Sequence, residues 1–402
     1  MSFIQTPNSN RLHIALFGRR NSGKSSLVNA LAGQDVTLVS DTPGTTTDPV
    51  LKAMEIHGIG PCLFIDTPGY DDEGELGKQR VERTLQIVEK TDIALLLCNK
   101  ENGDIPSDLT EDIHWIELLK KKKIPVIPLV NKADSSDYAT LNVSAIEKHT
   151  SSSPLFVSAK TGHGIELIRQ AIIRCLPEDF DAQSITGTLI TEDDLVLLVM
   201  PQDVQAPKGR LILPQAQTLR ELLDKKCITI CCTTDKLPNT LQALSRPPKL
   251  IITDSQVFKT VYEQKPKESK LTSFSVLFAA YKGDIDYYVE SAKHIENLNK
   301  SSCILIAEAC THAPLSEDIG RVKLPRLLRK RIGEELQIDI VSGNDFPPDL
   351  SKYSLIIQCG ACMFNRKYVL NRIEQAKKQQ IPMTNYGIAI AFMNNILDKI
   401  EY

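Results

Sequence analysis

Two groups of residues in this chain have types and spacings that could carry chemistry. The first is the loop at residues 18–25, GRRNSGKS, which fits the pattern G-x-x-x-x-G-K-S of a phosphate-binding loop. The second lies near the other end of the chain, where Cys310 and His312 are followed by Cys359 and Cys362 at C-x-x-C spacing. The loop predicts nucleotide binding, and the cysteines predict a metal or redox centre.

The phosphate-binding loop stands in the context that its mechanism needs. The apolar run at 12–17 predicts a strand before it, and residues 25–32 predict a helix after it. Gly18 and Gly23 would let backbone N–H groups turn toward phosphates, and the start of the helix adds a partial positive charge. Lys24 is predicted to reach the β- and γ-phosphates.

The remaining polar side chains of the loop complete the predicted contacts. Ser25 offers its hydroxyl to Mg2+. Further residues expected to line the nucleotide are Asn21, Ser22 and Ser26. Arg19 and Arg20 have two open interpretations, as loop cations that supply positive charge to the phosphates or as solvated surface residues.

Further motifs follow in the order expected of a guanine-nucleotide domain. Asp66 ends an apolar run and would hold Mg2+ through water, while the amide of Gly69 would sense the γ-phosphate. Asp134, in the sequence NKAD, would accept hydrogen bonds from N1 and the exocyclic amine of guanine. Adenine lacks this donor pair, so the motif selects GTP over ATP. Further residues expected around the base are Asn131, Lys132, Ser158, Ala159 and Lys160.

A hydroxyl-rich segment at residues 41–48, DTPGTTTD, is the predicted switch. Thr46 is the first choice for contacting Mg2+ in the triphosphate state, and Thr45 is its alternative. The predicted catalytic set is Lys24, Thr46, Asp66 and Gly69.

Composition bounds the setting in which these residues act. A chain of 402 residues predicts several domains, and 42% hydrophobic with 24% charged residues is typical of globular proteins. The net charge of -3 offers no electrostatic case for nucleic acid or acidic membranes, so we expect neither as a partner. The apolar runs are too short to cross a bilayer and the first residues lack a signal core. We therefore expect a cytoplasmic protein with free thiols.

The pattern of apolar runs and amphipathic stretches predicts an α/β fold throughout. We expect a P-loop GTPase domain at 1–176, followed by two smaller α/β domains with mainly parallel sheets, at 185–265 and 270–402. Residues 177–183 and the charged stretch 263–270 are interpreted as linkers. Because the middle domain carries no catalytic constellation, we expect it to mediate dimerisation.

The third domain is predicted to bring the cysteines together. Strand-like runs at 303–307 and 355–357 lead directly toward Cys310 and toward Cys359. Ligands of open α/β sheets bind beyond the carboxyl ends of strands, so the two loops should meet there. The C-x-x-C spacing lets two thiolates hold one centre, with Gly360 expected to permit the tight turn.

Spacing alone leaves the nature of the centre open. Zinc bound by Cys310, Cys359, Cys362 and His312, a [4Fe–4S] cluster on the three cysteines, and a redox pair all fit. Three unconnected cysteines are the remaining interpretation. The cysteines in apolar stretches are expected to be small buried hydrophobes: Cys62, Cys98, Cys175, Cys227 and Cys303.

The first domain resembles the GTPase group that contains the tRNA-modification and ribosome-assembly G domains, which share a Gly-Thr-Thr-x-Asp switch. That group places an asparagine at the position of Asn21, where it helps to bind K+. After Gly69 stands Tyr70 rather than a glutamine that would orient water. The resemblance implies slow hydrolysis that depends on Mg2+ and K+, with K+ supplying the charge of an arginine finger.

The whole chain resembles the [FeFe]-hydrogenase maturation GTPases, the HydF family, in its GTPase domain, small middle domain and Cys-x-His with a later Cys-x-x-Cys. The resemblance implies a [4Fe–4S] cluster on Cys310, Cys359 and Cys362. It further implies a scaffold, expected as a homodimer, that receives a [2Fe] subcluster precursor carrying CO and cyanide. The implied partners are two radical-SAM maturases and the [FeFe]-hydrogenase apoprotein.

The chain departs from the family at one position beside the cysteines. Many members have a histidine directly before the Cys-x-x-Cys, where this chain has Gln358. The fourth ligand of the cluster therefore stays open between His312, Glu308, a water and a group from elsewhere. The alternative function is an RNA- or ribosome-associated GTPase with a structural zinc, which the small net charge and 5% aromatic content disfavour.

Overall fold

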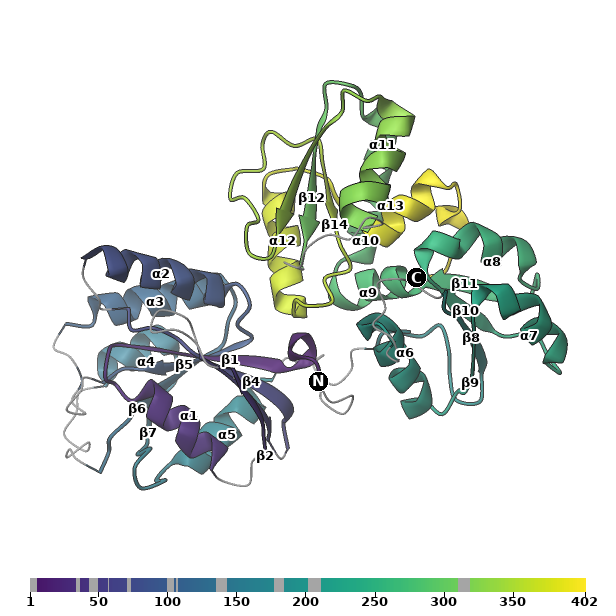
Figure 1. Cartoon of the computed structure of the whole chain (residues 1–402). Coiled ribbons are helices and arrows are strands. Elements are labelled where there is room, and N and C mark those ends of the chain that lie inside the picture. The colour runs from purple at the N-terminus through teal and green to yellow at the C-terminus, as the bar shows by residue number, and fades with distance from the viewer. Residues whose placement is uncertain are drawn as a thin grey trace. The chain divides into compact units, whose positions relative to one another are not determined.

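The computed structural model describes residues 6–33, 37–42, 50–56, 58–70, 74–99, 105, 108–134, 143–176, 184–201, 211–309 and 319–402 (Figure 1). Of the predicted site residues, Thr45, Thr46, Cys310 and His312 lie outside these ranges. The chain divides into two compact units, Met1–Phe180 and Asp181–Tyr402.

The first unit is built on a seven-stranded sheet in the order β2-β3-β4-β1-β5-β6-β7. Its strands are β1 Leu12–Gly18, β2 Thr37–Thr42, β3 Val50–Ile56, β4 Gly60–Asp66, β5 Ile93–Leu97, β6 Val126–Val130 and β7 Leu155–Phe156. Its helices are α1 Lys24–Ala32, α2 Gly74–Val88, α3 Thr110–Lys121, α4 Ser144–Thr150 and α5 Ile165–Arg174, after the 3-10 turn η1 Asn8–Asn10.

The central position of β1 explains its composition. Every residue of β1 is buried, and the strand is parallel to both of its neighbours, β4 and β5. Strands covered on both faces have nearly continuous apolar sequences, as LHIALFG has. Only β2 and β3 are antiparallel to their neighbours in this sheet. The carboxyl end of β1 therefore delivers the phosphate-binding loop to the middle of the sheet edge.

The second unit contains two four-stranded sheets, both parallel. One sheet has the order β11-β10-β8-β9, with β8 Leu195–Val199, β9 Ile228–Cys232, β10 Leu250–Thr253 and β11 Lys270–Ser273. Its sequence also includes α6 Leu213–Asp224, α7 Leu237–Ala243 and α8 Phe258–Gln264, with the 3-10 turns η3 Thr234–Lys236 and η4 Ser255–Val257.

The other sheet of this unit has the order β13-β12-β14-β15. Its strands are β12 Cys303–Glu308, β13 Gln337–Ser342, β14 Leu355–Gln358 and β15 Met383–Asn385. The helices are α9 Phe274–Lys282, α10 Ile285–Ala292, α11 Leu324–Ile332, α12 Arg366–Lys378 and α13 Tyr386–Met393, with the shorter turns η5 Lys293–Asn297, η6 Ile319–Lys323 and η7 Leu397–Lys399. The predicted fold class, a P-loop domain followed by α/β units with mainly parallel sheets, is confirmed.

The charged stretch 263–270 differs from its interpretation as a linker. α8 runs to Gln264, and Lys270 begins β11, which pairs with β10. β11 was not recognisable in the sequence because KLTS is short and only one of its residues is apolar. Its last three residues are buried by the neighbouring elements, and burial rather than composition makes it a strand.

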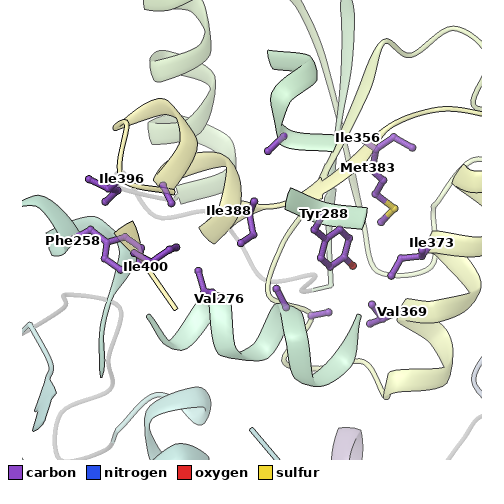
Figure 2. Packing of buried hydrophobic residues seen from close by; sticks show 14 of the residues in the cluster. Phe258, Val276, Tyr288, Ile356, Val369, Ile373, Met383, Ile388, Ile396 and Ile400 are labelled. Carbon is purple, nitrogen blue, oxygen red and sulfur yellow. The ribbon is translucent and has the colours of Figure 1, made fainter. Parts of the chain in front are cut away.

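The two sheets of the second unit share one hydrophobic core. Leu197 and Ile251 of one sheet belong to the same buried cluster as Leu305 and Ile356 of the other. Figure 2 shows part of this cluster around α9, where Val276 lies among side chains from several elements. Because α9 follows β11 directly and packs in this core, it connects the two sheets mechanically.

Among the described helices, none combines the length and the apolar character that a membrane span requires.

Candidate functional site

The phosphate-binding loop packs closely against the NKAD motif, which is predicted to recognise the base. Gly23 has φ 97°, and a Cβ at this position would lie 2.3 Å from Nδ2 of Asn131. A side chain is therefore excluded both by backbone conformation and by space. Lys24 is 8% exposed, and its Nζ donates to the carbonyl oxygens of Gly18 at 2.9 Å and Arg19 at 2.7 Å. The ammonium is thus held against the backbone of the loop, and its predicted contact with phosphates stays a prediction.

Two of the residues predicted to serve Mg2+, Ser25 and Asp66, lie together, while Thr46 is outside the described residues. The hydroxyl of Ser25 donates to Oδ2 of Asp66 at 2.5 Å. Burial raises the pKa of Asp66, whereas the hydrogen bond from Ser25 and the charge of Lys24 lower it. Thr67 follows Asp66 and donates from Oγ1 to the carbonyl of Leu16 at 2.5 Å. This hydrogen bond attaches the segment between Asp66 and Gly69 to β1. Gly69 is the residue predicted to sense the γ-phosphate.

Asn131 connects the phosphate side to the base side. Its Nδ2 donates to the carbonyl of Ser22 at 3.2 Å, and its Oδ1 accepts from the amide of Ala159 at 3.1 Å. Asn99 supports it: Oδ1 of Asn99 accepts from the amide of Asn131 at 2.9 Å, and Nδ2 of Asn99 donates to the same Ser22 carbonyl. The sequence analysis missed Asn99. Its position could have indicated this role, because Asn99 is a polar residue that closely follows the apolar strand β5.

The carboxylate of Asp134, which is predicted to recognise the base, is held by a neighbouring hydroxyl. Oδ1 of Asp134 accepts from Oγ of Ser158 at 2.5 Å, and this hydrogen bond lowers the pKa of Asp134, with a smaller contribution from Lys160. A lowered pKa favours the ionised, accepting form of this carboxylate, and its contact with guanine stays a prediction. Lys132 reaches across and donates to the backbone carbonyl of Asn21 at 2.9 Å. The structure thus brings the predicted loop and base residues together.

Arg19 has a role that neither open interpretation anticipated. Its Nη2 lies 2.6 Å from Oδ2 of Asp112, a fully buried residue of α3. Oδ1 of the same carboxylate accepts from the hydroxyl of Tyr70 at 2.6 Å, and the Tyr70 ring stacks on Trp115. Arg20, by contrast, is exposed. One buried carboxylate therefore joins the phosphate-binding loop, α3 and the residue that follows Gly69.

We expect Asp112→Ala to lower the free energy of unfolding of the first domain by about 3 kcal/mol, because Arg19 and Tyr70 lose a shared buried partner. Tyr70→Phe removes a single hydrogen bond and should lower it by about 1 kcal/mol. Urea unfolding followed by Trp115 fluorescence measures both, since Trp115 is the only tryptophan and contacts Tyr70. Equal losses in the two variants would show that the Arg19 ion pair contributes nothing.

The second candidate site lies at the carboxyl edge of the third sheet. β12 and β14 are parallel neighbours with Ala307 opposite Gln358. The amide of Cys359 donates to the carbonyl of Ala307 at 2.9 Å, and Sγ of Cys359 accepts from the amide of Ala309 at 3.0 Å. The residue that follows β12 and the residue that follows β14 therefore contact each other at the strand ends. Ala309 is the residue directly before Cys310, which lies outside the described residues.

The surroundings of Cys359 suit a sulfur ligand. Its Sγ accepts a second backbone hydrogen bond, from the amide of Ala361 at 3.4 Å. Burial raises the pKa of Cys359 to about 11, and these two amides and the charge of Arg372 lower it. The negative charge of Cys362 also raises it. Binding a metal would remove the thiol proton, because only the thiolate is a ligand.

Within the described ranges, no three histidine, cysteine or acidic side chains converge as a metal site. Cys359 and Cys362 are present there, and the predicted third cysteine is outside. Glu308, one of the candidates for the fourth ligand, is already engaged. Its Oε2 lies 2.9 Å from Nε of Arg321 and accepts from Ser342 at 3.4 Å.

The interpretation of Gly360 as the residue that permits the turn is wrong. Gly360 has no left-handed φ, whereas its neighbour Ala361 has φ 49°. A Cβ on Gly360 would meet no described atom within 4 Å. The strained position of the C-x-x-C loop is therefore occupied by a residue with a side chain, and Ala361 has to be held there by its surroundings.

Comparison with known proteins identifies the parts of the chain. Residues 185–283 match the hydrogen maturase F dimerization domain, and residues 286–401 match the hydrogen maturase F tetramerization domain. Residues 13–132 match the family described as 50S ribosome-binding GTPase.

Curated relatives match the first unit. The chain is 35% identical over 164 residues to the tRNA modification GTPase MnmE of Nitrosomonas eutropha, a match covering 40% of this chain and 34% of that protein. It is 37% identical over 169 residues to MnmE of Methylococcus capsulatus, again covering 40% and 34%. The chain thus spans about a third of the length of these relatives. Among solved structures, Aquifex aeolicus Era is similar to the chain with 21% sequence identity and a TM-score of 0.34. The match covers 58% of this chain and 98% of that one.

The N-terminal match agrees with the geometry of the phosphate loop and the NKAD motif, so the first unit is a GTPase domain. The two maturase F domains follow it in order and together cover more than half of the chain. The chain belongs to the hydrogen maturase F family.

Proposed function

We propose that this chain is a GTP-hydrolysing scaffold that holds a [4Fe–4S] cluster on Cys310, Cys359 and Cys362. In this proposal it receives a [2Fe] subcluster precursor and passes it to the [FeFe]-hydrogenase apoprotein. The single observation that carries the proposal is the 3.0 Å contact from the Ala309 amide to Sγ of Cys359. Cys310 is bonded to Ala309, and consecutive Cα atoms are about 3.8 Å apart. We therefore propose that the third thiol serves the same sheet edge as the pair.

The donor set fits such a cluster. Cysteine thiolates are the ligands of iron–sulfur clusters, and hydrogen bonds to their sulfurs help to set the reduction potential. Cys359 receives two such bonds from backbone amides. Bound there, the cluster would offer one iron without a cysteine ligand as the attachment point for the incoming unit. Since Arg321 and Ser342 engage Glu308, His312, a water or another group is the better proposal for the fourth ligand.

Anaerobic reconstitution with iron and sulfide tests the proposal. We expect about four iron and four sulfide per chain and an EPR signal after reduction. Stoichiometric zinc without inorganic sulfide would overturn the cluster and favour a structural zinc site.

All described cysteines are free thiols, which is consistent with the reducing cytoplasm that we propose as the compartment.

We propose that Ser25, Thr46 and Asp66 serve Mg2+ and that Asn21 helps to bind K+ beside the phosphates. Asn21 has a left-handed backbone, φ 55°, and Lys132 holds its carbonyl. Replacing K+ with Na+ should slow hydrolysis roughly tenfold or more, because a preorganised positive charge is lost near the transition state. Asn21→Ala should abolish this difference between the ions. The matched control is Arg20→Ala, at an exposed position of the same loop, and it should leave the K+ dependence intact. Loss of hydrolysis in Arg20→Ala would indicate that this arginine, rather than K+, supplies the positive charge near the transition state.

Nucleotide state is proposed to control binding of partner proteins. A coupling of about 1–3 kcal/mol between the nucleotide and partner sites would be enough to change affinity 5- to 150-fold. The partners proposed from the family are the radical-SAM maturases and the hydrogenase apoprotein. Pull-down affinities with GDP and with a non-hydrolysable GTP analogue would differ by this factor; equal affinities would refute the switch.

The domain matches indicate oligomerisation, and we propose that β9 forms a dimer interface. Among the described strands, β9 is at the edge of its sheet, and its residue Ile228 is 49% exposed. An exposed apolar edge strand readily pairs with another chain. Ile228→Lys should therefore reduce the mass measured by light scattering. Leu223→Lys on α6, a position 55% exposed, is the control and should not change it. An unchanged mass for Ile228→Lys would place the interface elsewhere.

A further inference from the structure

A buried lysine lies against the C-x-x-C loop. Lys282 is the last residue of α9 and is 2% exposed. Its Nζ donates to the carbonyl of Ala361 at 3.1 Å and to the carbonyl of Phe364 at 2.8 Å. These carbonyls lie on either side of Cys362 in the sequence. A lysine at the end of a helix normally extends into water, so its sequence position did not predict this contact.

Lys282 has no carboxylate partner among the described residues. The ionisable groups that raise the pKa of its ammonium there are the side chains of Cys362 and Cys359, which do so in their thiolate forms. Burial lowers the pKa of Lys282 to about 8, while the two thiols raise it. Burying an ammonium that is not paired with an acid is unfavourable. An anion at the cysteines would offset that cost.

A second buried cation, Arg372, lies near the same loop. Arg372 on α12 is 3% exposed, and its guanidinium carbon is 4.7 Å from the centroid of the Phe364 ring. Its Nη2 donates to the carbonyl of Gly343 at 2.6 Å, and in the described part of the chain Nε and Nη1 have no hydrogen-bond partner. The charge of Arg372 lowers the pKa of Cys359. Two buried cations, Lys282 and Arg372, therefore act on the C-x-x-C loop.

The position of Lys282 is fixed by the helix that carries it. α9 begins at Phe274, and the hydroxyl of the preceding Ser273 caps it by accepting from the amide of Val276 at 3.2 Å. Val276 and Ala279 are buried in the core that both sheets share. Ala361 and Phe364, in contrast, belong to a loop, and Ala361 has a left-handed φ. The contact thus joins a helix end to the turn that carries Cys362, and Ala361 lies in the same buried cluster as Val276.

We propose that Lys282 is the positioning residue and counter-cation of the cysteine site. Its ammonium holds the turn that presents Cys359 and Cys362, and its charge offsets the net negative charge of a thiolate-bound cluster. This inference rests on the proposed cluster function and assigns a role that is separate from ligation.

The test compares three substitutions after anaerobic reconstitution. Lys282→Met removes the charge and both hydrogen bonds, Lys282→Gln keeps a donor without charge, and Lys282→Arg keeps the charge. Reduction adds negative charge to the cluster, so loss of a buried cation should disfavour it. We expect Lys282→Met and Lys282→Gln to lower the reduction equilibrium constant at least tenfold, a shift of 59 mV to more negative potential for one electron. Lys282→Arg should restore the wild-type potential.

Lys265→Met is the matched control. Lys265 also donates to two carbonyls, those of Pro266 and Ser269, but it closes a turn away from the cysteines. It should leave the potential and the iron content unchanged. If Lys282→Met changes only the melting temperature, or if the potential of Lys282→Gln equals that of the wild type, the proposed role is wrong.

The same measurements separate this inference from the function on which it rests. A wild-type protein that takes up no inorganic sulfide would overturn both proposals. A wild-type cluster whose potential is indifferent to Lys282 would overturn the counter-cation role alone. Should Lys282→Met fail to fold, Lys282→Gln and Lys282→Arg still decide the outcome, because they differ chiefly in charge.

Discussion

Replacing Lys24 with alanine is expected to reduce GTP hydrolysis about a thousandfold while the chain still takes up iron normally. The ammonium is held by the carbonyls of Gly18 and Arg19 in the loop, where we propose that it meets the β- and γ-phosphates. Charge that develops on these oxygens in the transition state loses its nearest protein cation, and removing one preorganised donor typically lowers kcat 10²–10³-fold. Phosphate release at saturating Mg2+ and GTP, together with iron analysis of the reconstituted protein, measures both expectations.

Lys122→Ala is the control for this variant. Lys122 is a lysine of the same domain whose Nζ pairs with Glu89 at 2.6 Å, so its removal should leave hydrolysis unchanged. Wild-type hydrolysis in Lys24→Ala would contradict the assignment of the loop. Loss of iron in the same variant would contradict the separation of the nucleotide and cysteine sites.

Cys359→Ser is expected to lose the cluster and to leave GTP hydrolysis within about twofold of the wild type. Serine preserves the shape of the side chain and can accept from the amides of Ala309 and Ala361, so the loop should remain folded. A hydroxyl does not replace the thiolate that iron requires. Iron should fall from about four atoms per chain to nearly none. Cys310→Ser and Cys362→Ser should behave in the same way.

Cys303→Ser provides the matched control on the same sheet. Cys303 begins β12, is partly buried, and is predicted to be a packing residue. It should retain the full iron content, so equal losses in Cys303→Ser and Cys359→Ser would mean that the sheet, rather than the ligand, was damaged. Full iron retention in Cys359→Ser would exclude this thiol as a ligand.

Much of the GTPase domain could be predicted because its motifs act locally. The strand at 12–17, the glycine loop and the following helix are adjacent in sequence, and the structure has them as β1 and α1 in direct succession. NKAD likewise follows β6 directly. Each motif combines an apolar period with residues of restricted conformation, and such signals need no knowledge of distant partners.

Other features depended on partners far away in the chain. Arg19 and Asp112 are 93 residues apart, and Lys282 is 79 residues from Ala361. The periodicity of apolar residues gives no information about contacts between residues so far apart in the sequence. A basic residue in a loop or at a helix end is compatible with solvent, phosphate or a buried acid. Packing selects among these environments: it pairs the partly exposed Arg19 with a buried acid and buries Lys282 against two backbone carbonyls.

The sequence by itself determined the order of the α/β elements, the guanine-nucleotide motifs and the candidate thiols, because residue type and short spacing encode these directly. Only the tertiary structure decided that β11 completes the second sheet, that Ala361 rather than Gly360 carries the left-handed turn, and that Lys282 lies beneath it. The physical reason is that burial and close approach arise from the packing of whole elements. A short segment acquires its partners, and with them its conformation and charge, only when those elements come together.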